Sequence, residues 1–62
     1  MSDIDTAAEA VIRIEAALNE LNNQLDIEKD VEKRVDLGKK VANKRVEVRK
    51  ARQALATAIA SA

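Results

Sequence analysis

One apolar ridge constrains the fold of this chain more than any other feature. Seven apolar residues recur at steps of three and four through the first 25 positions: Ile4, Ala7, Val11, Ile14, Leu18, Leu21 and Leu25. A repeat of 3.5 residues is typical of a helix that packs along its length against another helix. The ridge therefore predicts a long amphipathic helix whose apolar seam needs a partner helix.

The composition leaves helix packing as the main source of stability. The 62 residues include no Cys, His, Trp, Tyr, Phe or Pro, and a single Gly. Disulfides and the usual zinc or haem sites are therefore excluded, and the largest apolar side chains are absent. A core of this size supplies about 3–5 kcal/mol at most, and small folds often add oligomerisation. We expect one all-α domain, residues 1–62, that assembles into an oligomeric helical bundle or coiled coil.

The end of the ridge at Leu25 suggests where the chain reverses. The run Asn22–Asp26 contains two turn-prone Asn residues, and Asp26 is suited to cap a second helix. We predict an antiparallel hairpin of two long helices, with a helix over about 3–24 that Ser2 caps, a turn at about 22–27 and a helix over about 27–60. Because this turn lacks Gly and Pro, one uninterrupted helix is an alternative. A second break at Gly38 would give three helices.

The second helix has a less regular apolar pattern than the first. One stripe keeps heptad spacing that Lys44 interrupts, and it contains Leu37, Val41, Val48, Ala51, Leu55, Ala58 and Ala62. Val31, Val35 and Ala42 lie on another stripe. Gly38 falls where the stripes cross and is a candidate kink. The second helix also exceeds the first in length, which predicts an overhang of about ten residues at its end. Besides the ridge, we expect helix–helix contacts at Val41, Val48, Leu55 and Ile59.

Charge is divided sharply between the two halves of the chain. Residues 1–32 carry nine acidic and two basic side chains, whereas residues 33–62 carry nine basic and two acidic ones. The halves therefore have net charges of −7 and +7. Parallel, in-register helices would place like charges side by side, and antiparallel pairing sets acid against base. Exposed pairs contribute little individually, so the split selects an arrangement rather than supplying stability.

The chain lacks the side chains that most catalysis requires. It has no Cys or His, and its only hydroxyl groups lie near the two ends. The acidic run Asp26, Glu28, Asp30 and Glu32 lacks the glycine and spacing of a calcium loop. We expect no enzyme activity, cofactor or metal. The acidic start is unlike a signal peptide, and no apolar run approaches the roughly 20 residues that span a bilayer. We expect a soluble protein that is cytoplasmic, or within a virion if viral.

Two functions are compatible with these features. The first is a helical interaction or assembly module, such as an adaptor, inhibitor or structural component, whose partner is itself or a larger protein. The alternative is a small nucleic-acid-binding protein that uses the basic segment Lys33–Arg52. Its candidate contacts are Lys39, Lys40, Lys44, Arg45, Arg49 and Arg52. These bases surround the helix and no aromatic side chains accompany them, so we favour the interaction module. The alanine-rich C-terminal segment does not favour membrane binding.

Overall fold

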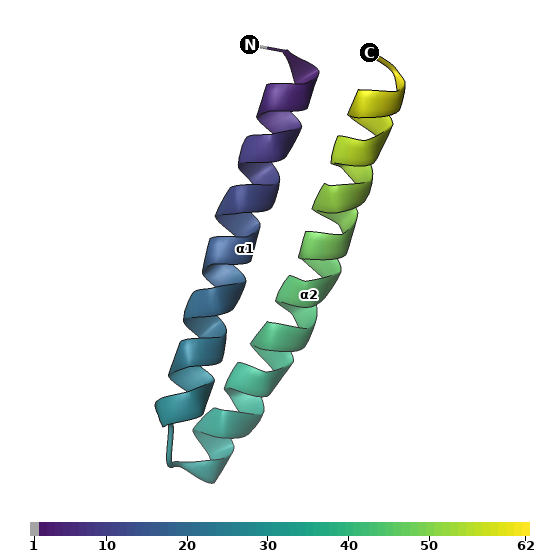
Figure 1. The fold of residues 1–62 in the computed structure, drawn as a ribbon. Coiled ribbons are helices and arrows are strands. Elements are labelled where there is room, and N and C mark those ends of the chain that lie inside the picture. The colour runs from purple at the N-terminus through teal and green to yellow at the C-terminus, as the bar shows by residue number, and fades with distance from the viewer. Residues whose placement is uncertain (1) are drawn as a thin grey trace.

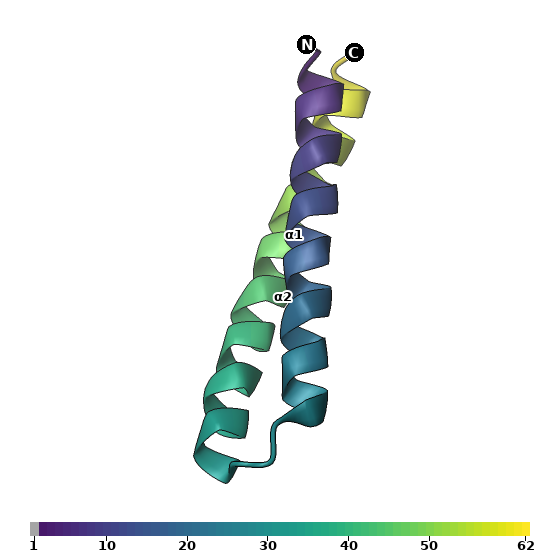
Figure 2. The same ribbon diagram turned by 90° about the vertical axis from the view of Figure 1, so that its left-hand side faces the viewer.

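Two antiparallel helices make up the fold. The computed structural model describes residues 2–62, with α1 at Asp3–Ile27 and α2 at Val31–Ala60. The helices lie side by side, so both ends of the chain are at the same end of a rod measuring 47 × 16 × 11 Å (Figure 1). A perpendicular view shows them crossing at a shallow angle (Figure 2). The predicted all-α hairpin is confirmed, and the one-helix and three-helix alternatives are wrong.

Each helix begins at a side chain that caps its free backbone N–H groups. The Ser2 hydroxyl accepts a hydrogen bond from the Asp5 N–H at 3.2 Å, and the Asp30 carboxylate accepts one from the Lys33 N–H at 3.1 Å. Acidic side chains in the first turns also favour the positive end of each helix dipole. Local side-chain chemistry therefore determines both helix starts.

The turn comprises residues 28–30, which corrects the prediction of a turn at 22–27. Helix α1 continues through Asn22 and Asn23 to Ile27. Tertiary packing outweighs the low helix propensity of Asn, because the longer helix keeps Leu25 half-buried. The Glu28 carboxylate then accepts hydrogen bonds from the N–H groups of Lys29 and Asp30, both at 3.1 Å. No residue from 2 to 62 has a positive φ, so this turn needs no glycine.

Arg34 ties the start of α2 to the end of α1. Its guanidinium donates to the carbonyl oxygens of Leu25 at 2.8 Å and Glu28 at 2.9 Å. The last turn of α1 has no basic residue of its own to complement its terminal carbonyl groups. A positive charge from the opposite helix therefore fills the role that a C-terminal Lys or Arg usually has.

The helices meet along one apolar seam, but the seam is only partly enclosed. All seven ridge residues of α1 are half-buried. Opposite them, Val41 and Val48 are 6% and 7% exposed, and they are the only buried residues of the described chain. The other half-buried α2 residues in this register are Leu37, Lys44, Ala51, Leu55 and Ala58. The heptad stripe that Lys44 interrupts is therefore the contact stripe, and Lys44 lies within it.

The register leaves no overhang at the end of α2, which corrects the expected excess of about ten residues. Glu15 and Arg52 form an ion pair at 3.0 Å, and Ile4 lines the same groove as Ala58 and Ala62. Because the turn comes later than predicted, α1 is longer and α2 shorter, and the two ends coincide. Helix α2 also continues through Gly38 without a break.

Candidate interaction surface

The hairpin has two long sides flanking the seam, and one of them is rich in exposed aliphatic groups. This side carries the Glu15–Arg52 ion pair. Ile12 precedes Glu15 by three residues and Ile59 follows Arg52 by seven, so both share that side. Val31 precedes Arg52 by three heptads, and Val35 lies one helical turn after Val31. We call the surface formed by Ile12, Val31, Val35 and Ile59 the aliphatic face.

The aliphatic face is exposed to solvent in the hairpin. Its four defining side chains are between 53% and 73% exposed. Among residues 2–62 only two other large aliphatic residues are exposed, and of these Val46 lies at the edge of this face and Ile27 on the opposite side. Helical spacing adds Ala8, Ala42 and Ala56, whose small side chains leave the surface open to close approach. Ile59, which was predicted to contact the other helix, lies here and not in the seam.

Three arginines occupy the middle of the aliphatic face. Arg45, Arg49 and Arg52 line an open groove together with Leu18 and Val48 of the seam. Arg52 pairs with Glu15, whereas Arg45 and Arg49 form no ion pair among residues 2–62. The face is thus basic at its centre and aliphatic toward both ends. Such a pattern suits an acidic or amide-bearing helix with apolar groups on either side.

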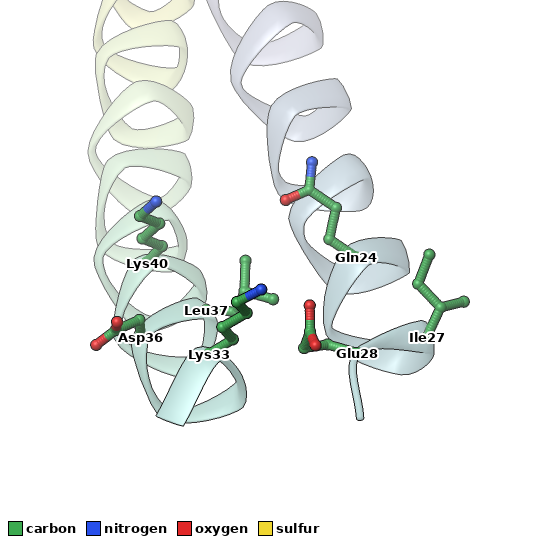
Figure 3. Close-up of a pocket in the computed structure, with 7 residues that line it drawn as sticks. All are labelled: Gln24, Ile27, Glu28, Lys33, Asp36, Leu37 and Lys40. Atoms are coloured by element: carbon green, nitrogen blue, oxygen red, sulfur yellow. The ribbon is translucent and has the colours of Figure 1, made fainter. Parts of the chain in front are cut away.

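The opposite side is polar, and we call it the polar face. At the turn end it has a groove of about 420 Å³ lined by Gln24, Ile27, Glu28, Lys33, Asp36, Leu37 and Lys40. Figure 3 shows Lys33 and Leu37 pointing toward α1, whereas Ile27 points away from the groove. At the other end, Ser2, Asp3, Thr57 and Ser61 line a second groove. Alternating charges and small hydroxyl groups give this side the character of an ordinary solvated surface.

The six basic residues predicted as one contact set do not share a surface. Lys44 lies half-buried in the seam, where its ammonium pairs with Glu47 at 2.9 Å. Lys40 lines the groove of the polar face. Lys39 is exposed on α2, seven residues before Val46 at the edge of the aliphatic face. Only Arg45, Arg49 and Arg52 gather together.

Neither a metal centre nor a membrane span is found in the part of the chain that the structure describes. No three acidic side chains between residues 2 and 62 converge to hold a metal ion. Glu28 and Asp30, from the acidic run, instead accept hydrogen bonds from backbone N–H groups. Neither α1 nor α2 has an apolar stretch sufficient to cross a bilayer.

The aliphatic face was missed by reasoning from the sequence alone, although part of its signal was visible. Val31 and Val35 stood out as a stripe separate from the heptad of α2. Their alignment with Ile12 on the other helix depends on the register of the hairpin. The apolar contact stripe of α1 ends at Leu25, and that of α2 begins at Leu37. The midpoint between these two residues is residue 31, and this spacing favours a turn close to the observed one.

Comparison with known protein families, with curated proteins and with solved structures gives no match to this chain.

Proposed function

We propose that this protein is a non-enzymatic interaction or assembly module that works through helix–helix contacts of the coiled-coil type. One observation carries the proposal: the hairpin does not enclose its own apolar seam. No residue of α1 is buried, and α2 buries only Val41 and Val48. Stable domains bury the apolar stripes of their helices against further elements, so this seam is suited to receive additional helices.

The aliphatic face supports the same function. An exposed apolar surface with a polar surround is typical of a protein–protein interaction site. Interfaces also favour arginine over lysine, and the centre of this face has three arginines and no lysine. The hairpin would act as a short rod that presents this face to a partner, with its own ion pair, Glu15–Arg52, keeping the two helices in register.

Site-specific photo-cross-linking in the native source tests this proposal. A photoreactive residue at Ile12, on the aliphatic face, should give one discrete cross-linked product. The same residue at Ile27, on the polar face, is the matched control because both isoleucines are exposed on α1. It should give no discrete product. Equal, diffuse labelling from both positions would reject a defined interaction surface.

Nucleic-acid binding is the second candidate, and the free guanidinium groups of Arg45 and Arg49 favour it. They lie together beside Leu18 in an open groove and can reach phosphate groups. In this case the affinity for duplex or single-stranded nucleic acid should fall steeply between about 50 and 200 mM salt. The double substitution Arg45→Ala with Arg49→Ala should weaken binding to all sequences alike. No binding at about 50 mM salt would dismiss this candidate.

A further inference from the structure

We propose that a second copy of this chain covers the aliphatic face, and that α1 of each copy lies against α2 of the other in a four-helix bundle. The proposal rests on the interaction function above and names its partner. Three observations support a second copy in this arrangement. They are the exposed area, the division of charge between the helices, and the placement of the Glu15–Arg52 pair.

The exposed area matches the need of a dimer. The hairpin exposes 4804 Å². A compact monomer of its 6.8 kDa mass would expose about 3,950 Å² by the usual scaling of surface with mass. The excess of about 850 Å² is close to the roughly 800 Å² that each partner buries in a standard protein–protein interface.

The charge on each helix determines how two copies can stack. Helix α1 has six acids and one base, for a net charge of −5, and α2 has nine bases and three acids, for a net charge of +6. A twofold axis along the rod places α1 of each copy over α2 of the other. A twofold axis across the rod places α1 over α1 and α2 over α2. Only the lengthwise axis sets acidic helices against basic ones.

The lengthwise axis also extends the ion pair on the aliphatic face. The charged groups of Glu15 and Arg52 meet at 3.0 Å in one hairpin. Stacking about this axis brings the ion pair of one copy beside the ion pair of the second copy. The four side chains then alternate in charge, with each Glu15 next to an Arg52 of both copies. Each Glu15 carboxylate then lies between two Arg52 guanidinium groups. Closer to the turn, the same stacking sets Arg45 and Arg49 of one copy opposite the part of the other copy's α1 that carries Asn19 and Asn22, whose amide oxygens accept hydrogen bonds.

Cysteine scanning tests the arrangement, because the natural chain has no cysteine. A lengthwise twofold axis keeps every residue at the same height along the rod. A residue of the aliphatic face near the axis therefore lies close to the same residue of the second copy, at either end of the rod. Single variants Val31→Cys and Ile59→Cys, at opposite ends, should therefore each form a disulfide-linked dimer under mild oxidation. Ile27→Cys, on the polar face, should not. With a crosswise axis, neither single variant would form a disulfide-linked dimer by itself, but a mixture of Val31→Cys and Ile59→Cys chains would. That result would overturn the arrangement.

Sedimentation of the purified chain tests self-association itself. The full chain should sediment as a dimer of twice its 6.8 kDa mass at micromolar concentration. Ile12→Lys should raise the dimer dissociation constant about tenfold or more, because it places a charge in an apolar part of the proposed contact. Ile27→Lys is the control and should leave the constant unchanged. Circular dichroism of each variant at the same concentration establishes that the helices are intact.

The outcomes separate this inference from the function on which it rests. A purified monomer whose Ile12 cross-linker still captures one foreign protein would overturn self-association and retain the interaction function. A monomer that gives no discrete product would overturn both. A monomer that instead binds nucleic acid through Arg45 and Arg49 would also overturn the dimer, since the second copy would cover both side chains.

Discussion

At the scale of single residues, Val46 and Val48 differ sharply in burial although they are only two positions apart on α2. Val48 is 7% exposed and packs in the seam, whereas Val46 is 45% exposed at the edge of the aliphatic face. Val48→Ala should lower the free energy of unfolding by about 1.5–2 kcal/mol, since two buried methyl groups are lost. Val46→Ala should cost less than about 0.5 kcal/mol. Urea denaturation followed by circular dichroism measures both, and equal losses would contradict the register.

Gly38 is a helical residue that has room for a side chain. Apart from its two chain neighbours and the backbone of its own helical turns, no atom lies within 4 Å of the position that its Cβ would occupy, and its φ is not positive. Gly38→Ala should therefore raise the free energy of unfolding by about 0.5–1 kcal/mol, because alanine loses less backbone entropy in a helix. Thermal unfolding checks this. A decrease in stability would mean that another backbone packs against Gly38 in the assembled protein.

Lys44 occupies a seam position that an apolar residue would normally fill. Its side chain is 27% exposed and pairs with Glu47, which is itself 51% exposed, so the pair contributes only a few tenths of a kcal/mol. Lys44→Leu should raise the free energy of unfolding by about 1 kcal/mol or more by adding apolar contact. Polar residues at such positions also restrict register and oligomeric state. Sedimentation of the variant should therefore reveal a broader range of oligomers, and a single unchanged species would contradict that role.

At the scale of elements, the start of α2 depends on one side chain. Asp30 accepts a hydrogen bond from the Lys33 N–H, while Asp26 lies within the last turns of α1. Asp30→Ala should cost about 1 kcal/mol of stability. Asp26→Ala should be neutral or slightly stabilising, since it removes a negative charge near the negative end of α1. Chemical denaturation of the two variants distinguishes the observed turn from one at 22–27, for which the order of effects would be reversed.

At the scale of the whole molecule, the open seam and the aliphatic face make stability depend on association. If folding and assembly are coupled, the melting temperature should rise with chain concentration, for example between about 1 and 100 μM. Ile12→Lys should abolish most of this dependence, and Ile27→Lys should preserve it. A melting temperature that is constant over this range would show that the hairpin is stable as a monomer.

The amino-acid sequence determined the features that depend on local spacing. The 3.5-residue repeat of Ile4 to Leu25 predicted a long helix with one apolar seam, and the absence of Pro excluded breaks of the usual kind. Ser2 marked the start of α1 because capping involves residues only three positions apart. The division of charge between the two halves also predicted antiparallel packing. The net charge of each half changes little when the end of a helix is misplaced by several residues, so this prediction did not depend on the exact turn.

Only the tertiary structure decided where α1 ends, the register of the two helices and the surface that follows from them. Ending α1 at Ile27 instead of near Asn22 depends on packing against α2, which no local pattern reports. The turn is closed by Arg34, six residues beyond Glu28, and uses no glycine. A shift of one residue rotates the faces of a helix by about 100°. The alignment of Ile12 with Val31, Val35 and Ile59 therefore emerged only once the two helices were placed together.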